Sequence, residues 1–243
     1  MTLEKNQAIL VLKIDKLRNS SSKIVEILTT VINNGYKKPM RKYGIIKSLR
    51  IKTPQVFFSD LGFDKDPASS VLYIYLKNIT PEQRSELLKV YREIEFKGVT
   101  FYVTLPNIDN YEILSVFSLD QIIGTAGFKP YCLESCGDPQ GMEKDLCAMY
   151  ELTGFTTFQK GLGLSFLPIA SDYTCSVYPI KTLVSQVIVE HELVTYYCKL
   201  HGYEEKSRVF VKSGGDSSEA GLENDIIADD FHLATLYKSV LKC

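Results

Sequence analysis

Residues 18–52 read RNSSSKIVEILTTVINNGYKKPMRKYGIIKSLRIK, and the interpretation of the whole chain starts from this stretch. It begins with apolar residues at helical spacing, turns at Gly35 and then carries basic residues up to position 52 without a single acid. Residues 1–53 hold twelve Lys/Arg against three Asp/Glu, whereas the remainder of the chain holds sixteen against twenty-six. A near-neutral chain that is polarised in this way presents a positive surface patch, which bears on its binding partners.

The chain of 243 residues suffices for one large domain or two small ones with a buried core. No apolar run approaches the length of a membrane span, and the apolar stretch near the N-terminus is too short for a signal peptide. Six cysteines without a secretory signal favour reduced thiols. We therefore expect a protein that is not secreted and that lies in the cytoplasm or nucleus. A position at the periphery of membranes or in a virion fits the same observations.

Hydrophobic periodicity predicts an α+β fold. The apolar face that begins at Ile24 indicates a helix that stops at Gly35, and Pro39 fits the first turn of a second helix. The motif Thr80-Pro81-Glu82-Gln83 predicts a capping box that opens a helix to about residue 95, with Leu87 and Leu88 buried. The expected elements of the first half are strands at 8–17, 71–76 and 99–105, helices at 24–32, 40–51 and 81–95, and a loop at 53–70.

Residues 134–146, ESCGDPQGMEKDL, form the best candidate linker, because the composition changes beyond them. β-Branched and aromatic residues predict strands at 156–167, 173–178, 182–189 and 208–212, and residues 193–200 fit either a strand or a helical turn. Asp229 or Asp230 is expected to start a final helix. The expected layout is an N-terminal lobe of helices packed on a small sheet (residues 1–133), the linker, and a β-rich C-terminal lobe with a terminal helix (residues 147–243).

Two groups of residues resemble metal sites, and neither completes one. His191-Glu192 begins like the HExxH motif of zinc proteases, but Thr195 stands where the second histidine belongs. Cys132, Cys136, Cys198 and His201 have a loosely zinc-like spacing, yet the two pairs lie far apart in the chain and a buried inert cysteine is commoner. We therefore expect no bound metal.

The segment Gly161-Leu162-Gly163 is glycine-rich but lacks the downstream Gly and Lys of a phosphate-binding loop. A strand bulge or a tight turn explains it better. No cysteine or histidine lies in the sequence context of an activated nucleophile. The expectation from the residues is a protein without a catalytic residue or a cofactor.

The basic stretch is the strongest candidate site, because its density exceeds what solubility requires. It suits an anionic lipid surface, to which each Lys or Arg contributes about 1 kcal/mol, or the phosphates of a nucleic acid or nucleocapsid. An acidic segment at residues 213–230 offers a complementary surface for self-association. The residues expected to bind the polyanion are Lys37, Lys38, Arg41, Lys42, Lys47 and Arg50.

The order of the expected elements resembles the core of rhabdovirus matrix proteins over about residues 8–130. The likeness consists of a strand, a Ser-rich cap, a helix, the turn Gly-Tyr-Lys-Lys (35–38), the helix Tyr-Gly-Ile-Ile-Lys-Ser-Leu (43–49) and the strand pair that ends in Phe-Lys-Gly-Val-Thr-Phe-Tyr-Val (96–103). The chain lacks the basic N-terminal tail and the Pro-Pro-x-Tyr motif of the animal-virus members, so a plant-infecting or divergent member is the easier fit.

Three functions remain open at this point. The resemblance implies a non-enzymatic structural protein that self-associates in virion assembly and binds an anionic membrane surface or ribonucleoprotein. The basic stretch by itself also suits a monomeric RNA-binding module. The third alternative is an enzyme whose site is assembled from residues scattered along the chain.

Overall fold

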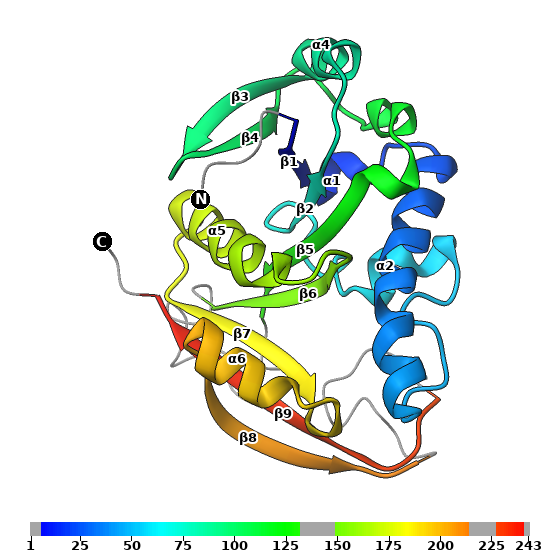
Figure 1. Ribbon diagram of the computed structural model, residues 1–243, viewed down its shortest axis with the longest axis vertical. Helices are drawn as coiled ribbons and strands as arrows, with labels where there is room; N and C mark the ends of the chain where they lie inside the picture. The colour runs from blue at the N-terminus through cyan, green and yellow to red at the C-terminus, as the bar shows by residue number, and fades with distance from the viewer. Residues whose placement is uncertain (1–5, 132–148, 214–226, 241–243) are drawn as a thin grey trace.

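The computed structural model describes residues 6–131, 149–213 and 227–240 (Figure 1). The strands are β1 (Ala8–Lys13), β2 (Val71–Leu76), β3 (Tyr91–Phe96), β4 (Val99–Thr104), β5 (Ile122–Pro130), β6 (Met149–Thr157), β7 (Thr182–Ile188), β8 (Glu204–Val211) and β9 (Phe231–Ser239). They form one sheet in the order β3-β4-β1-β2-β5-β6-β7-β9-β8. The pairs β1–β4 and β6–β7 are parallel, and the other neighbours are antiparallel.

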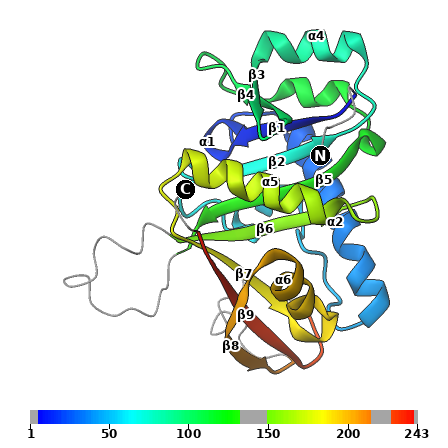
Figure 2. The same cartoon turned by 60° about the vertical axis from the view of Figure 1, so that its left-hand side comes forward.

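Helices cover both faces of this sheet (Figures 1 and 2). The α-helices are α1 (Ile14–Leu17), α2 (Ser22–Tyr43), α3 (Phe57–Asp60), α4 (Pro81–Val90), α5 (Leu162–Val177) and α6 (Leu193–His201). Short 3-10 turns are η1 (Pro54–Val56), η2 (Glu112–Val116), η3 (Leu119–Gln121) and η5 (Val189–His191). The long helix α2 lies on one face, and α5 and α6 lie on the other.

The alternation of side chains along β1 explains the two layers of core. Leu10 and Leu12 pack in the cluster that contains Leu28 of α2, whereas Ile9 and Val11 join the cluster that contains Phe166 of α5. A strand between two helical layers is buried on both faces, so it is apolar along nearly its whole length. The mixture of helices and strands expected from the sequence is confirmed, as one large mixed sheet.

Helix α2 runs without interruption from Ser22 to Tyr43, so the predicted stop at Gly35 and the predicted second helix over 40–51 are wrong. Gly44 ends the helix in the left-handed conformation, with φ of 70°. Gly35 instead allows α2 to approach β6 closely, because a Cβ at this position would lie 1.6 Å from Oγ1 of Thr156. The glycine therefore lets the helix touch the sheet, and residues 40–43 form its last turn.

Three predictions in the C-terminal half are also wrong. Residues 162–177 form a helix, although the sequence predicted strands at 156–167 and 173–178. Residues 231–239 form β9, between β7 and β8, and not a final helix. In β9, Leu233, Ala234 and Leu236 are all buried, because both faces of the strand are covered. Such a strand lacks the strict alternation of apolar and polar residues, and the spacing of its apolar residues therefore resembled that of a helix.

The capping box at the start of α4 is confirmed. The side chain of Thr80 accepts a hydrogen bond from the backbone N–H of Gln83 at 3.2 Å, and the side chain of Gln83 accepts one from the backbone N–H of Thr80 at 3.1 Å. Leu87 is fully buried as predicted, but Leu88 is 47% exposed. The helix also ends at Val90, because the chain continues as the edge strand β3.

The predicted linker at residues 134–146 and most of the acidic segment at 213–230 lie outside the described residues. The proposed boundaries at 133 and 147 therefore stay predictions, although β5 and β6, on either side of them, pair in one sheet. Among the described residues, no helix is both long enough and apolar enough to cross a membrane.

Candidate functional site

The parallel strands β6 and β7 separate partway along their length. Residues 149–151 of β6 pair with residues 182–184 of β7, and beyond this point no further pairs connect the two strands in the described chain. Each strand keeps its outer neighbour, since β6 pairs with β5 up to Thr157 and β7 pairs with β9 up to Ile188. The inner edges of residues 152–157 and 185–188 therefore face a gap with backbone N–H and C=O groups available to a ligand.

A bulge in β6 lies just beyond the point where the two strands separate. The partners of β5 jump from Thr156, opposite Thr125, to Thr153, opposite Gly127, so Gly154 and Phe155 stand opposite Ala126 alone. Gly154 has φ of 56°, and its carbonyl oxygen accepts a hydrogen bond from the buried Thr125 hydroxyl at 2.5 Å. An extra residue in one strand bends that strand, and bulges commonly stand beside functional sites.

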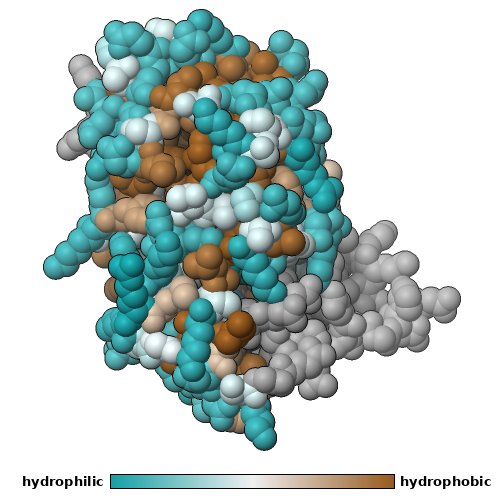
Figure 3. Space-filling view, turned by 90° about the vertical axis from the view of Figure 1, so that its right-hand side faces the viewer, coloured by the Kyte–Doolittle hydropathy of each residue, from teal (hydrophilic) through white to brown (hydrophobic). Residues whose placement is uncertain are grey.

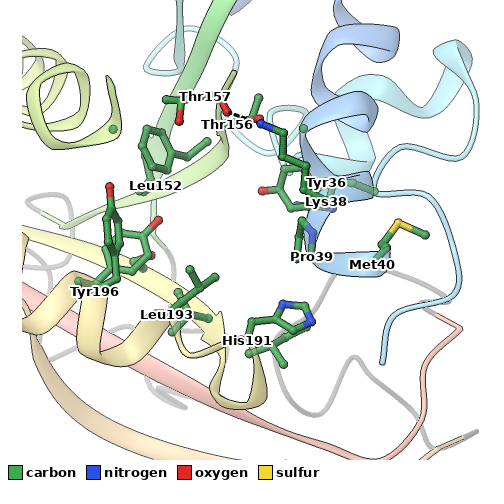
Figure 4. Close-up of a pocket in the computed structure, with 18 of the residues that line it drawn as sticks. Tyr36, Lys38, Pro39, Met40, Leu152, Thr156, Thr157, His191, Leu193 and Tyr196 are labelled. Carbon is green, nitrogen blue, oxygen red and sulfur yellow. Dashed lines mark hydrogen bonds between the residues drawn. The ribbon is translucent and has the colours of Figure 1, made fainter. Parts of the chain in front are cut away.

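The gap opens into a cavity of about 1020 Å³ (Figure 4). Its walls come from β6, β7, the C-terminal half of α2, the start of α5, the turn η5 and helix α6. Figure 4 shows Tyr36, Pro39 and Met40 on the α2 side and Tyr196 of α6 opposite them. This volume is at the upper end of the range of ligand sites in proteins.

The turn between β6 and α5 forms one end of the cavity. Gly161 precedes the helix in the left-handed conformation, with φ of 82°, so the glycine-rich segment is a tight turn, one of the two explanations expected from the sequence. Gln159, Lys160 and Gly163 line the cavity together with Gly161. The N-terminal end of a helix carries partial positive charge, and here the N–H groups of Leu162 and Leu164 donate to the carbonyl oxygens of Gln159 and Gly161. This end of the cavity is therefore suited to an anionic group.

Tyr196 links the start of α5 to helix α6. Its hydroxyl lies so close to Gly163 that a Cβ there would be 2.5 Å from the oxygen. Burial raises the pKa of the Tyr196 phenol, so the hydroxyl keeps its proton at neutral pH. A side chain on Gly163 would displace this hydroxyl, and both residues line the cavity. Tyr196 is thus a neutral hydrogen-bond donor at the wall opposite α2.

The six predicted basic residues divide between the cavity and its surroundings. Lys38, Lys42 and Arg50 line the cavity, whereas Lys37, Arg41 and Lys47 are not among its lining residues in the described chain. The four at positions 37–42 lie on the last two turns of α2, and the other two lie in the segment that follows this helix.

Several of these cations have partners within the fold. Lys38 donates to the carbonyl oxygen of Thr157 at 3.3 Å, and Lys47 forms an ion pair with Asp229. Arg50 donates to the carbonyl oxygen of Asp60. The surface seen from the side of α2 mixes hydrophilic and hydrophobic areas (Figure 3). Binding of a lipid surface or nucleic acid by the six residues stays a prediction.

The segment that follows β7 contacts the C-terminal end of α2. The His191 ring stacks on the Tyr43 ring with centroids 4.9 Å apart and an interplanar angle of 25°. The Tyr43 hydroxyl donates to Glu192 at 2.9 Å, and Lys42 donates to the same carboxylate at 3.2 Å. These contacts join η5 to α2 across the cavity.

Sequence reasoning missed most of this site. The sequence indicated His191 only as part of an incomplete HExxH motif, and it gave no signal for Tyr196. Residues 193–200, left open between strand and helix, form α6. Of the loosely zinc-like set, Cys132 and Cys136 lie outside the described residues. Among the residues that are described, no group of three potential metal ligands comes together.

The fold is similar to that of a solved N-acetyltransferase. A crystal structure described as "a putative phosphinothricin N-acetyltransferase" is 11% identical, covers 96% of this chain and 99% of that chain, and has a TM-score of 0.51. A spermidine N-acetyltransferase from Vibrio cholerae, in complex with CoA and spermine, is 10% identical over 97% of this chain and 96% of that chain, with a TM-score of 0.48. At these identities the likeness is one of fold.

The chain belongs to the sporulation protein RMD6 family, whose model matches residues 1–240. The sporulation protein RMD6 of Saccharomyces cerevisiae is 30% identical over 237 residues, which are 96% of this chain and 95% of that protein. The resemblance to rhabdovirus matrix proteins is therefore wrong, and with it the expectation of a structural protein of virion assembly. The pattern that suggested it included a helix at 43–49 and a turn at Gly35, and the structure contains neither.

Proposed function

We propose that the chain is an acyltransferase that takes an acyl group from a coenzyme A thioester, in place of the non-enzymatic role expected from the sequence. The observation that carries the proposal is the separation of β6 and β7 into a cavity against the first turn of α5. The likeness of fold to an acetyltransferase supports the same class of reaction.

The unpaired edges of β6 and β7 suit the arm of coenzyme A. This arm is extended and carries two amides between the diphosphate and the thiol. An extended chain with amides can add to an exposed strand edge through backbone hydrogen bonds, as peptides do. Residues 152–157 offer such an edge on one side of the gap and residues 185–188 on the other.

The start of α5 suits the diphosphate. Phosphates bind at helix N-termini because the free N–H groups and the helix dipole both favour negative charge. Lys160 lies in the turn before this helix, and Lys38 lies beside the end of β6, where it donates to Thr157. Both side chains belong to exposed residues, so they can move to a phosphate at this end of the cavity.

The reacting thioester would then lie between the strands, within the cavity. A nucleophile of the acceptor attacks the carbonyl carbon, a bond to that carbon forms, and the C–S bond breaks. The thiolate that leaves requires a proton. Tyr196 is the neutral donor on this wall, and we assign it the role of general acid.

Isothermal titration calorimetry of the purified chain with coenzyme A tests the proposal. We expect binding, and the double variant Lys38→Glu/Lys160→Glu should weaken it by about 10- to 100-fold, as the loss of a hydrogen bond to a charged group does. The control is Lys23→Glu/Lys89→Glu, which makes the same change of charge at exposed positions away from the cavity. Absence of binding at millimolar coenzyme A would overturn the proposal, and equal weakening in both variants would remove the assigned phosphate site.

A further inference from the structure

The charged side chains in the cavity wall are mostly basic. Four of them carry a positive charge: Lys38, Lys42, Arg50 and Lys160. Among the described residues that line the cavity, only Glu151 is acidic. This carboxylate forms an ion pair at 3.4 Å with Lys129, which is buried, so its charge is already offset within the fold. The cavity therefore has a positive potential, which favours ligands that carry negative charge.

Two of the four cations lie at the outer end of the gap, where β6 ends. Figure 4 shows Lys38 with its hydrogen bond to this strand, and the acceptor is the carbonyl oxygen of Thr157, the last residue of β6. Lys160 lies in the turn that follows the strand. Both are assigned above to the diphosphate of coenzyme A, so a different part of the wall has to receive the acceptor.

Arg50 lies at the inner end of the gap. Its Nη2 donates to Oγ1 of Thr153 at 3.5 Å, and Thr153 follows closely on residues 149–151, the part of β6 that still pairs with β7. Thr153 and Thr157 are four residues apart, which is at most about 13 Å along a strand. Because the diphosphate is placed beside Thr157, the extended arm of coenzyme A brings the thioester toward Arg50.

The fold holds Arg50 in this position. Its Nη1 donates to the carbonyl oxygen of Asp60. The next residue, Ile51, is fixed by Asn33 of α2, which is 6% exposed: Nδ2 donates to the Ile51 carbonyl at 2.8 Å, and Oδ1 accepts from the Ile51 N–H at 2.9 Å. A guanidinium has five N–H donors in a rigid plane, so it can bind an anion while it keeps its contacts with the fold. Arg50 is thus a preorganised cation.

Lys42 is the remaining cation of the wall, and it differs from Arg50 in its setting. It is exposed at the end of α2, where it donates to the Tyr43 hydroxyl at 2.6 Å and to Glu192 at 3.2 Å. Exposed ion pairs of this kind contribute little free energy and their side chains move readily. Lys42 therefore adds to the positive potential of the cavity, whereas Arg50 is the cation with a fixed place beside the thioester.

We propose that the acceptor is an amine that also carries an anionic group, a carboxylate or a phosphate, and that Arg50 binds this group. The inference rests on the proposed function, because the thioester determines where the amine reacts. A guanidinium binds carboxylates and phosphates through two parallel hydrogen bonds. An amine with a second positive charge would bring that charge toward Arg50, and like charges at a binding site discriminate against such a ligand. The acceptor class is therefore an acidic amine, and diamines and polyamines are excluded.

The reaction of such an acceptor balances in atoms and charge. A neutral amine attacks the carbonyl carbon with its own lone pair, and the C–N bond forms. The C–S bond breaks, its electron pair stays on sulfur, and the thiolate takes a proton from the Tyr196 hydroxyl. The nitrogen releases one proton to solvent and the phenolate regains one. The anionic group of the acceptor stays bound to Arg50 and takes no part in the bond changes.

The first test uses the parent chain and measures the release of thiol from acetyl-coenzyme A with matched amines. 4-Aminobutyrate, 4-aminobutanamide and 1,4-diaminobutane have the same chain length and end in an anion, a neutral amide and a cation. After correction for the fraction of neutral amine, kcat/KM should be about 10-fold or more higher for 4-aminobutyrate than for the other two, as a hydrogen bond to a charged group provides. 3-Aminopropylphosphonate, compared with 4-aminobutyrate, distinguishes a phosphate acceptor from a carboxylate acceptor.

The results of this test separate the inference from the proposed function. Equal values for the three amines, or the highest value for the diamine, would overturn the inference. If the chain binds coenzyme A and acetylates none of the amines, the inference also fails and the coenzyme A site stands. If coenzyme A does not bind, the proposed function itself fails.

The second test assigns the preference to Arg50. In Arg50→Gln the ratio of kcat/KM for 4-aminobutyrate to that for 4-aminobutanamide should fall to about one, mainly through a higher KM for the anion, and Arg50→Lys should retain part of the ratio because it keeps the charge. Arg92→Gln is the matched control, since Arg92 is exposed on β3 and is not among the lining residues, and it should keep the parent ratio. Thermal melts show that each variant is folded. A parent-like ratio in folded Arg50→Gln would overturn the assignment.

Discussion

Replacement of Gly35 by alanine tests the packing that closes the cavity on the α2 side. In an exposed helix this change would stabilise by about 1 kcal/mol, because alanine is the better helix former. Here the new Cβ would lie 1.6 Å from Oγ1, 2.4 Å from Cβ and 2.8 Å from Cγ2 of Thr156. The Thr156 Cβ is attached directly to the backbone of β6, so a rotamer change does not relieve the contact and the helix or strand has to shift.

Overpacking of this kind costs typically about 1–3 kcal/mol, and we expect a net loss of roughly 2 kcal/mol for Gly35→Ala. For a chain of this length that loss lowers Tm by about 4–8 °C. Thermal and denaturant melts of purified protein measure both quantities. Asn34→Ala is the control, because Asn34 is the exposed neighbour in the same turn and its replacement should change stability by about 0.5 kcal/mol or less.

A double-mutant cycle assigns the loss to the contact with Thr156. Thr156→Ala removes Oγ1 and Cγ2 but leaves Cβ, so Gly35→Ala should cost less in this background and still cost something. Thr156→Ala should also weaken binding of coenzyme A, because Thr156 lines the cavity. A Gly35→Ala protein that melts at or above the parent temperature would refute the close approach of α2 to β6.

Three further predictions concern stability. Leu87→Ala should cost about 2–5 kcal/mol and Leu88→Ala about 0.5 kcal/mol or less, since only the first side chain is buried, and equal costs in denaturant melts would show that the helix is rotated. Thr80→Ala should cost about 0.5–2 kcal/mol through loss of the cap, measured in the same way. The free energy of unfolding should also fall as pH drops below about 6.5, because burial lowers the pKa values of His191 and His201 in the folded state and the unfolded chain therefore binds protons first. The double variant with Gln at both positions should show a weaker dependence of stability on pH in melts from about pH 7.5 to 5.5.

The parts of the fold that followed from the sequence are those controlled by neighbouring residues. The capping box at Thr80 needs only four consecutive residues, and the strand at 71–76 is a short β-branched and aromatic run. The predicted helix from Ile24 was right in type and too short. Its apolar spacing is local information, whereas its continuation through Gly35 depends on β6, more than a hundred residues away.

The site itself depended on contacts between distant segments. The cavity exists because β6 and β7 pair for only three residues on each strand, and α5 separates these strands in the chain. The basic residues of α2 and the histidine after β7 come together only across this gap. Periodicity reports the burial of one face at a time, so it misassigned the strand β9, which is buried on both faces. Local chemistry thus determined caps, turns and the type of several elements, whereas long-range strand pairing decided the fold, the cavity and which side chains line it.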